Sequence, residues 1–493
     1  MADILQFCRP EAVGVRPEWV SNYVNELNRR RKMCHSFLMI RHGKVFAEGY
    51  WKPVHESWLH RQYSVSKSFV SVAIGLLVDA GRIKLTDRIV DYFPDQLPED
   101  LHPLIAEMTI RDMLMMATCH KYSTYKFTDM DWLKTFFQPH WEPDHKAGTE
   151  FRYDTSATYT MDVLVERMIG RDFLEFLKDK VLRELGFSGN AWCVKAPEGY
   201  AWGGSGVMCT TRDLARFGLL VLNHGCLNGK QYVSKEYMEA ATAKQIDNFT
   251  GTVDSIHGHG YGYQFWRQMD GSFGCLGMGG QLIFCNPEKD FIFVCNSDTQ
   301  GDEDGYAVLA QVMYDEVLSK ITAETLPAED EAWTSMNQLL GSLEVNVPVG
   351  ETTSPLAEKI RGITYRLEEN PMGIRSFRLD LEETQGQLHL DTARGEKVFH
   401  FGLGAYQEDV FPESHYSGGA INHPIGRGYR AIHAGLWQAE NQLLIRTYVI
   451  DDYFGNLASV FTFEGDKVHL SMRKTAEAFL DEYQGEADGK AIR

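Results

Sequence analysis

The hydrophobic pattern changes character near residue 358, and this change constrains the fold more than any other feature of the sequence. Beyond it, four segments alternate apolar and polar residues, with turn residues between them: 376–391, 396–404, 442–450 and 459–472. Such alternation is typical of half-buried antiparallel strands. A closed barrel or a sandwich is the natural arrangement for strands of this kind. The C-terminal part is therefore predicted to be all-β.

The part before this change mixes strands and helices. Residues 36–50 predict two strands joined by a turn at His42-Gly43. Helical patterns predominate between about 85 and 240, strand character returns at 260–297, and a helix is expected at 303–320. Strands first, inserted helices and strands last predict an α/β (α+β) domain with an antiparallel sheet flanked by helices.

The chain is too long for one hydrophobic core. At 493 residues it is expected to divide into at least two domains. We predict a first domain at 1–325, a linker at 326–358 that is acidic and contains prolines, and a C-terminal β domain, a barrel or lipocalin-like, at 359–493.

Composition excludes several classes of partner. The 49 Lys and Arg against 68 Asp and Glu give a formal charge of -19, which repels nucleic acid. No apolar segment approaches the roughly 18 residues of a membrane span, and no basic region followed by an apolar stretch marks a secretory signal. Nine scattered cysteines without a CxxC pair favour reduced thiols over disulfides or a zinc site. We expect a cytoplasmic protein that binds neither nucleic acid nor membrane.

Ser64 and Lys67 lie one helical turn apart in the apolar segment "RQYSVSKSFVSVAIGLLVDAG" at 61–81, which predicts a buried helix ended by Gly81. A catalytic serine needs an adjacent base. Lysine can be that base where burial lowers the pKa of its amine. The backbone N–H groups at a helix start also suit an anion. The alternative is a capping serine beside a lysine whose amine reaches solvent.

The SxxK pattern alone is weak, because the chain contains it three times: Ser64-Lys67, Ser123-Lys126 and Ser471-Lys474. The second copy lies in a polar, tyrosine-rich segment without an apolar helical face. The third ends a predicted strand, where positions i and i+3 point to opposite sides. Only the first copy is predicted to lie on a buried helix.

The sequence around the first copy resembles a known family. "YSVSKSFVSVAIGLLVDAGRIKLTDRIVDYFPD" resembles the serine-lysine helix of the β-lactamase and penicillin-binding-protein fold, in its class C β-lactamase, family VIII esterase and 6-aminohexanoate-dimer hydrolase branch. Further matches follow in order: "MTIRDMLMMATCH", "AGTEFRYDTSATY", "GGSGVMCTTRDLARFGLL", "GYGYQFW" and "GMGGQ". The resemblance spans roughly residues 12–320. It implies a serine hydrolase that works through an acyl-enzyme, with no metal or organic cofactor.

The resemblance implies a second motif, a tyrosine followed two residues later by asparagine or serine. "FRYDTS" supplies Tyr153, with Thr155 in the partner position. Tyr153 would share a proton with Lys67 and protonate the leaving group. The alternative is a core ring with its hydroxyl in water.

The third motif of the family is Lys-Thr-Gly, or a variant with His first, on an edge strand. Here "GCLGMGGQ" aligns Gly277 with the glycine, but Cys275 and Leu276 occupy the polar places. The backbone N–H of Gly277 or Met278 would complete an oxyanion hole with that of Ser64. Gly279 belongs to the same expected substrate-binding turn. Because Cys275 replaces the Lys or His of the motif, no cation stands at this position, which argues against recognition of a substrate carboxylate.

Several other residues are weaker candidates. The aromatic residues Tyr261, Tyr263 and Trp266 are candidates to line the substrate site, although aromatic residues in strands more often form the core. His257 and His259 have HxH spacing, for which a glycine-rich loop near the site is a better interpretation than a metal.

Two glycine-rich segments do not match known catalytic patterns. "WGGSGV" fails the GxSxG spacing around Ser205. "GMGG" lacks the spacing of a dinucleotide site.

The predicted function is hydrolysis of a small-molecule amide or ester: a small-acyl ester, a D-amino-acid or cyclic amide, a linear amide oligomer or, less favoured, a β-lactam. The alternative is a non-catalytic ligand-binding or regulatory protein that retains the fold. The β domain could hold a ligand, cover the site or mediate contacts in a homo-oligomer.

Overall fold

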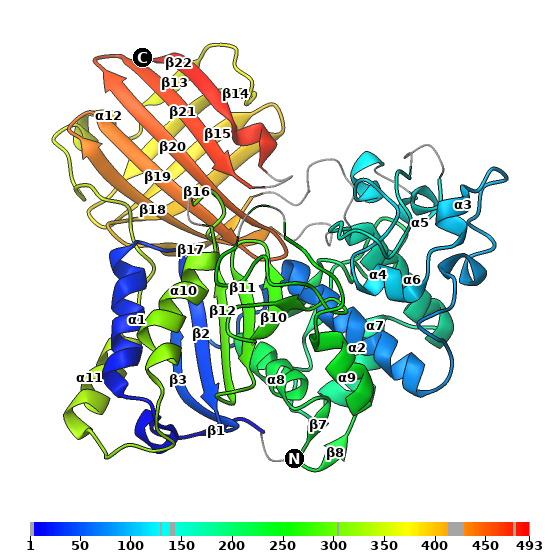
Figure 1. Ribbon diagram of the computed structural model, residues 1–493. Helices are drawn as coiled ribbons and strands as arrows, with labels where there is room; N and C mark the ends of the chain where they lie inside the picture. The colour runs from blue at the N-terminus through cyan, green and yellow to red at the C-terminus, as the bar shows by residue number, and fades with distance from the viewer. Residues whose placement is uncertain are drawn as a thin grey trace. The chain divides into compact units, whose positions relative to one another are not determined.

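The chain folds into two compact units. The computed structural model describes residues 4–128, 131–138, 143–249, 251, 253–302, 305–412, 428–476 and 480–492. Unit 1 extends to Leu343 and unit 2 begins at Glu344 (Figure 1). This division falls inside the segment 326–358 that the sequence marks as a linker, and the segment also contains a helix, α11 (Asp330–Gly341).

Unit 1 is organised around a seven-stranded sheet in the order β1-β3-β2-β12-β11-β10-β9. Its strands are β1 (Gln6–Phe7), β2 (Cys34–Arg41), β3 (Lys44–Tyr50), β9 (Trp266–Arg267), β10 (Phe273–Gly277), β11 (Gln281–Asn286) and β12 (Phe291–Ser297). All neighbours are antiparallel except β1 and β3. The predicted turn joins β2 to β3, with positive φ at both His42 (51°) and Gly43 (69°), as tight hairpins require.

Helices cover both faces of this sheet. On one face α1 (Pro17–Arg29) places Tyr23 edge-on against Phe37 and Phe293, with ring centroids 5.2 and 5.7 Å apart. On the other face α8 (Thr211–Leu222) packs Gly218 against Ile292, the strand neighbour of Phe293. Helices α10 (Ala307–Glu316) and α11 pack against α1 (Figure 1). The predicted α/β (α+β) fold is confirmed.

The inserted helical part surrounds one buried helix, α2 (Ser66–Asp79), which contacts three other helices: α6 (Thr155–Ile169), α7 (Phe173–Leu177) and α9 (Lys235–Thr242). Shorter helices are α3 (Pro103–Ala106), α4 (Ile110–Leu114) and α5 (Trp132–Phe136). Capping boxes start α4, at Thr109, and α8, at Thr210. None of the helices among the described residues combines the length and apolar character needed to cross a bilayer.

Two small sheets complete unit 1. One has the order β4-β6-β5 and joins β4 (His60–Arg61), β6 (Val207–Cys209) and β5 (Trp192–Cys193). The other pairs β7 (Cys226–Leu227) with β8 (Lys230–Gln231). The first matters for the site, because β4 directly precedes the segment that carries Ser64.

Unit 2 contains a closed β-barrel. Its ten-stranded sheet runs β16-β15-β14-β13-β22-β21-β20-β19-β18-β17, and an additional β16–β18 pairing closes nine of these strands into the barrel. The strands are β13 (Thr364–Leu367), β14 (Ile374–Leu381), β15 (Gln385–Thr392), β16 (Gly395–Leu403), β17 (Gln407–Phe411), β18 (Tyr429–Ala439), β19 (Gln442–Ile450), β20 (Phe454–Glu464), β21 (Lys467–Thr475) and β22 (Gly485–Ala491). A short helix, α12 (Ala357–Ile360), precedes them. The predicted all-β C-terminal fold is confirmed.

Candidate active site

Ser64 lies in a 3₁₀ turn, Tyr63–Val65, between β4 and α2. The sequence predicted a helix beginning at Ser64, whereas the α-helix begins at Ser66. Tyr63 has a positive φ of 44°, which is uncommon for a residue with a side chain and reverses the chain just before Ser64. The turn leaves Ser64 half-buried at the start of a buried helix.

Lys67 is held against Ser64 inside the protein. It is 1 % exposed, and its Nζ donates hydrogen bonds to Ser64 Oγ at 2.9 Å and to the carbonyl oxygen of Gly204 at 2.6 Å. The alternative of a lysine reaching solvent therefore does not hold. Gly204 was not among the sequence candidates. A Cβ on Gly204 would lie 2.7 Å from Thr155 Cγ2, so this glycine lets the loop approach α6 and places Thr155 beside the lysine-binding carbonyl.

The loop that carries Gly204 is fixed by three neighbouring elements. The backbone N–H of Gly203 donates to Asp162 of α6 at 3.0 Å. Arg61 Nε donates to the carbonyl oxygen of Ser205 at 3.0 Å, and the N–H of Val207 donates to Ser66 Oγ at 2.9 Å. The acceptor for Lys67 therefore has a defined position. Ser205 accepts from Arg61 through both its carbonyl oxygen and its Oγ, the latter at 3.3 Å from Nη2.

Tyr153 lies just before α6 and its capping residue Asp154, and it faces Ser64 and Lys67. Its ring stacks on Trp266 with centroids 5.5 Å apart, and Lys67 Nζ lies 4.9 Å from its ring centroid. The residue as a whole is 37 % exposed, and its hydroxyl interacts with Ser64. Desolvation of the hydroxyl raises the pKa of Tyr153 well above its ordinary value, and the hydrogen bond with Ser64 offsets this only in part. At neutral pH Tyr153 is therefore a phenol that can donate a proton.

The third-motif turn contacts the segment that leads to Ser64. Gly277 ends β10, and a Cβ there would lie 2.4 Å from the carbonyl oxygen of Gln62. Gly279 (φ 77°) and Gly280 (φ 94°) turn the chain toward β11, and the Gly279 carbonyl accepts a hydrogen bond from Ser297 Oγ at 2.7 Å. Met278, between Gly277 and Gly279, is half-buried. Gly277 therefore lies beside the segment that leads to Ser64.

Cys275 occupies the place where the family has a cation. Its side chain is buried and interacts with Ser68 of α2, and burial raises the pKa of the thiol to about 12. Leu276 is buried as well. Strand β10 therefore presents a neutral thiol at this position.

The aromatic candidates separate into two groups. Tyr261 is buried and packs edge-on against Trp266, with centroids 5.1 Å apart, and against Tyr153 at 6.5 Å. Trp266 is half-buried. Tyr263 packs instead near Tyr237, at 6.0 Å, and belongs to the core. Trp266 and Tyr261 are therefore next to the site, and Tyr263 is not.

Both histidines of the HxH pattern contact Asp254. His257 Nδ1 pairs with Asp254 Oδ2 at 2.9 Å, and His259 Nε2 lies 2.7 Å from the Asp254 carbonyl oxygen. Across the described part of the chain, no group of three or more His, Cys, Asp or Glu side chains has the arrangement of a metal site.

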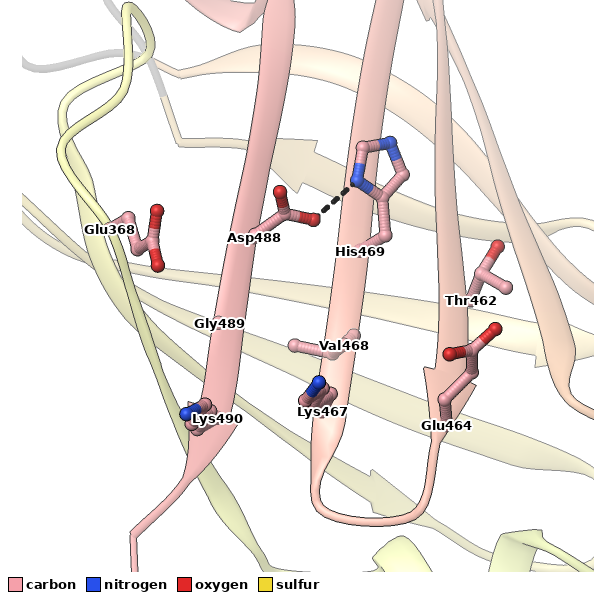
Figure 2. A pocket seen from close by; sticks show the side chains of 9 residues that line it. All are labelled: Glu368, Thr462, Glu464, Lys467, Val468, His469, Asp488, Gly489 and Lys490. Carbon is pink, nitrogen blue, oxygen red and sulfur yellow. Dashed lines mark hydrogen bonds and ion pairs between the residues drawn. The ribbon is translucent and has the colours of Figure 1, made fainter.

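A groove of about 480 Å³ lies on the outside of the barrel, over β20, β21 and β22 (Figure 2). Figure 2 shows His469 paired with Asp488, at 2.8 Å, and the like-charged Lys467 and Lys490 on neighbouring strands. Its lining contains no serine or cysteine. The groove is polar, open and of mixed charge, and its lining has no counterpart of the hydrogen-bonded pair Ser64 and Lys67 of unit 1.

Comparisons with known proteins agree with this geometry. A family model described as Beta-lactamase matches residues 22–316. A 6-aminohexanoate-dimer hydrolase from Paenarthrobacter ureafaciens is 27 % identical over 307 residues, which covers 58 % of this chain and 78 % of that protein.

Solved structures share the fold at low identity. The octameric penicillin-binding protein homologue from Pyrococcus abyssi has a TM-score of 0.50 at 16 % identity, covering 96 % of this chain and 99 % of that one. The hydrolase EstCE1, described as having promiscuous acyltransferase activity, has a TM-score of 0.50 at 14 % identity, covering 60 % and 99 %. The resemblance read from the motifs is confirmed. Because the family model spans more than half of the chain, the protein belongs to the beta-lactamase family of serine hydrolases.

Proposed function

We propose that the protein hydrolyses a small-molecule amide or ester through an acyl-enzyme on Ser64. The observation that carries this proposal is the buried Lys67 amine 2.9 Å from Ser64 Oγ. A serine hydroxyl becomes a useful nucleophile only when a base takes its proton as it attacks.

Lys67 is the base in this proposal. In its neutral form the amine keeps an N–H bond to the Gly204 carbonyl. The contact with Ser64 then reverses its direction, and the hydroxyl, 2.9 Å away, donates to the lone pair of Nζ. The proton of Ser64 then moves to Nζ while Oγ forms a bond to the substrate carbonyl carbon. The carbonyl oxygen takes the negative charge of the tetrahedral intermediate.

Tyr153 supplies the proton for the leaving group. When the intermediate collapses, the C–N or C–O bond breaks, the amine or alcohol leaves with the Tyr153 proton, and Lys67 returns a proton to Tyr153. A water molecule then attacks the Ser64 ester, gives one proton to the base, and releases the acid while Ser64 regains its hydrogen. The raised pKa of the Tyr153 hydroxyl keeps the phenol protonated at neutral pH, as a proton donor must be.

The remaining predicted residues bind substrate in this scheme. The backbone N–H of Ser64 and that of Gly277 or Met278 form the oxyanion hole. Gly279 shapes the same turn. Thr155, Tyr261 and Trp266 contact the acyl or leaving part of the substrate; they surround Tyr153 or the Gly204 carbonyl.

The substrate class follows from the site and the relatives. A small-acyl ester, a D-amino-acid or cyclic amide, a linear amide of the kind named for the Paenarthrobacter relative, and a β-lactam-like ring are all opened by this chemistry. No cofactor is part of the scheme. The names of the relatives lend no support to the alternative of a ligand-binding protein without turnover.

We further propose a hydrolase domain at 1–325, a linker at 326–358 and a β domain at 359–493, in a cytoplasmic protein. Nine free cysteines support a reducing compartment. Self-association into a homo-oligomer is part of the proposal; an octamer is described for the Pyrococcus relative, and light scattering of the purified chain tests it.

The decisive experiment labels the intact protein with a fluorophosphonate and maps the adduct by mass spectrometry. We expect the adduct on Ser64, none in Ser64→Ala, and unchanged labelling in Ser471→Ala, which alters an SxxK serine of the barrel. Hydrolysis of a chromogenic ester is compared with that of a chromogenic cephalosporin. An unlabelled Ser64 together with no turnover of either substrate would favour the binding protein instead.

A further inference from the structure

Asp162 is a buried carboxyl group that the proposed mechanism does not use. It lies in the middle of α6 and is 0 % exposed, as are its chain neighbours Met161 and Val163. Its Oδ2 accepts a hydrogen bond from the backbone N–H of Gly203 at 3.0 Å, whereas Oδ1 has no hydrogen-bond partner among the described residues. Burying a polar atom without a partner costs stability, so a carboxyl at this position needs a compensating role.

The surroundings of Asp162 keep this carboxyl uncharged. Desolvation is the largest cause and raises its pKa well above the ordinary value, and the acidic side chains of Glu166 and Asp172 raise it further. The hydrogen bond from Gly203 and the charge of Lys195 oppose this only in part, and Lys195 is itself paired with Asp172. Asp162 is therefore a carboxylic acid at neutral pH, and its side chain resembles an amide in shape and charge.

Gly203, the partner of Asp162, contacts both α6 and α2. A Cβ at Gly203 would lie 2.9 Å from Asp162 Cβ and 2.6 Å from Val70 Cγ2, so the chain has no room for a side chain here. Val70 lies one helical turn after Lys67 on α2, on the same face. The next residue of the loop, Gly204, provides the carbonyl oxygen that accepts from Lys67 Nζ at 2.6 Å. The bond to Asp162 therefore fixes the loop directly beside the acceptor for Lys67.

Glu166 makes a similar contact one helical turn further along α6. Its Oε1 accepts from the backbone N–H of Ala201 at 3.1 Å and from that of Phe173 at 3.3 Å. Positions 162 and 166 share one face of the helix. Two carboxyl groups of α6 thus hold alternate N–H groups of one loop, those of residues 201 and 203. Asp162 holds the one that is next to Gly204 in the chain.

We infer that Asp162 is a positioning residue, which holds the Gly204 carbonyl where it orients the Lys67 amine toward Ser64. The inference rests on the proposed function. Without Asp162 the N–H of Gly203 would be buried without an acceptor, and the loop would have to move to satisfy it. The Gly204 carbonyl would move with the loop, and Lys67 would lose a contact that sets the direction of Nζ. This role explains why α6 keeps a carboxyl group in apolar surroundings.

The test compares Asp162→Asn with Asp162→Ala in the full-length protein. Asparagine keeps an uncharged oxygen that can accept from Gly203, whereas alanine removes the acceptor. In Asp162→Ala we expect the rate constant for fluorophosphonate labelling of Ser64, and kcat for a chromogenic ester, to fall by about 10-fold or more, as when a buried donor loses its acceptor. Asp162→Asn should restore both to within about twofold of wild type. KM should change by less than about twofold in both variants, because the same base serves formation and hydrolysis of the acyl-enzyme.

Asp213→Ala is the matched control. Asp213 is also 0 % exposed, and it accepts from the backbone N–H groups of Ser188 at 2.9 Å and Thr210 at 3.1 Å, at the start of α8. Its removal should lower the midpoint of thermal unfolding and leave labelling and kcat unchanged below that midpoint. If Asp162→Ala does not fold, Asp162→Leu fills the space of the acid without an acceptor and should show the same loss of rate.

Three results would overturn the inference and leave the hydrolase proposal intact. They are wild-type rates in the folded variant without an acceptor at position 162, an Asp162→Asn variant as slow as that variant, and an equal loss of rate in Asp213→Ala. The last would show that rate follows stability alone. A wild-type protein with no labelled Ser64 and no turnover would overturn the inference and the proposed function together.

Discussion

A methyl group added at Gly277 would lie 2.4 Å from the carbonyl oxygen of Gln62, two residues before the nucleophile. This distance is shorter than any van der Waals contact, and the carbonyl oxygen belongs to the backbone, so it cannot rotate away as a side chain could. Gly277→Ala is therefore expected to push β10 away from the Ser64 turn and to open the oxyanion hole. We expect kcat/KM for a chromogenic ester to fall about 10²- to 10³-fold, as for loss of one oxyanion donor.

Gly189→Ala provides the comparison, because a Cβ at Gly189 meets no atom within 4 Å. It should retain wild-type kinetics. A thermal unfolding curve of Gly277→Ala shows whether the fold survives the strand shift. Full activity in a folded Gly277→Ala would place the oxyanion donors elsewhere.

Lys67→Arg distinguishes a base from a positive charge. Arginine keeps the charge and the donors but does not lose its proton in proteins. If Lys67 is the base, Lys67→Arg and Lys67→Met should both lower the rate of fluorophosphonate labelling of Ser64 by about 10²- to 10⁴-fold. Labelling of Lys67→Arg at a rate near that of the wild type would instead show that the amine acts through its charge.

Tyr153→Phe should separate amides from activated esters. The substitution keeps the ring that stacks on Trp266 and removes only the hydroxyl. An amine leaving group needs a proton, whereas p-nitrophenolate departs without one. We expect amide hydrolysis to fall about 10²-fold or more, and p-nitrophenyl ester hydrolysis to fall far less. Equal losses on a matched anilide and ester would contradict the acid role.

The sequence predicts much of the fold because its local signals agree with the global arrangement. The turn at His42-Gly43 lies where the sequence indicates. Strand β22 was not predicted, because Gly485–Ala491 is rich in glycine and charge and becomes a strand only by pairing with β13 and β21. Strand β18 is buried at consecutive positions. It therefore lacks the alternation of apolar and polar residues from which the neighbouring strands were predicted.

Local sequence signals also identify only part of the candidate site. Ser64 and Lys67 were singled out by their spacing on an apolar helix, and Tyr153 only by the resemblance to a known family. The acceptor for Lys67 is a backbone carbonyl 137 residues away, and a carbonyl has no signature in the residue type. The glycine pair at 203–204 was the available signal, since only glycine fits so close to Thr155 and Asp162.

Asp154, the residue after Tyr153, makes the stability of unit 1 depend on pH. It caps α6 by accepting from the N–H of Ser156 at 2.9 Å, and burial raises the pKa of this carboxyl from 3.8 to about 6 despite the hydrogen bond from Thr118. A pKa raised in the folded state favours folding at low pH, so this contribution, about 3 kcal/mol, is lost as the pH rises through 6. Asp154→Asn keeps the cap but does not titrate.

The midpoint of thermal unfolding of Asp154→Asn should therefore rise relative to wild type as the pH increases from 4.5 to 7.5. Groups that titrate elsewhere cancel in this difference, because both proteins contain them. Asp100→Asn, at an exposed position, should follow the wild-type curve at every pH. If the Asp154→Asn curve ran parallel to the wild-type curve, Asp154 would be ionised in both the folded and unfolded chain over this range. The α6 cap beside Tyr153 would then carry a full negative charge under the conditions in which the enzyme works.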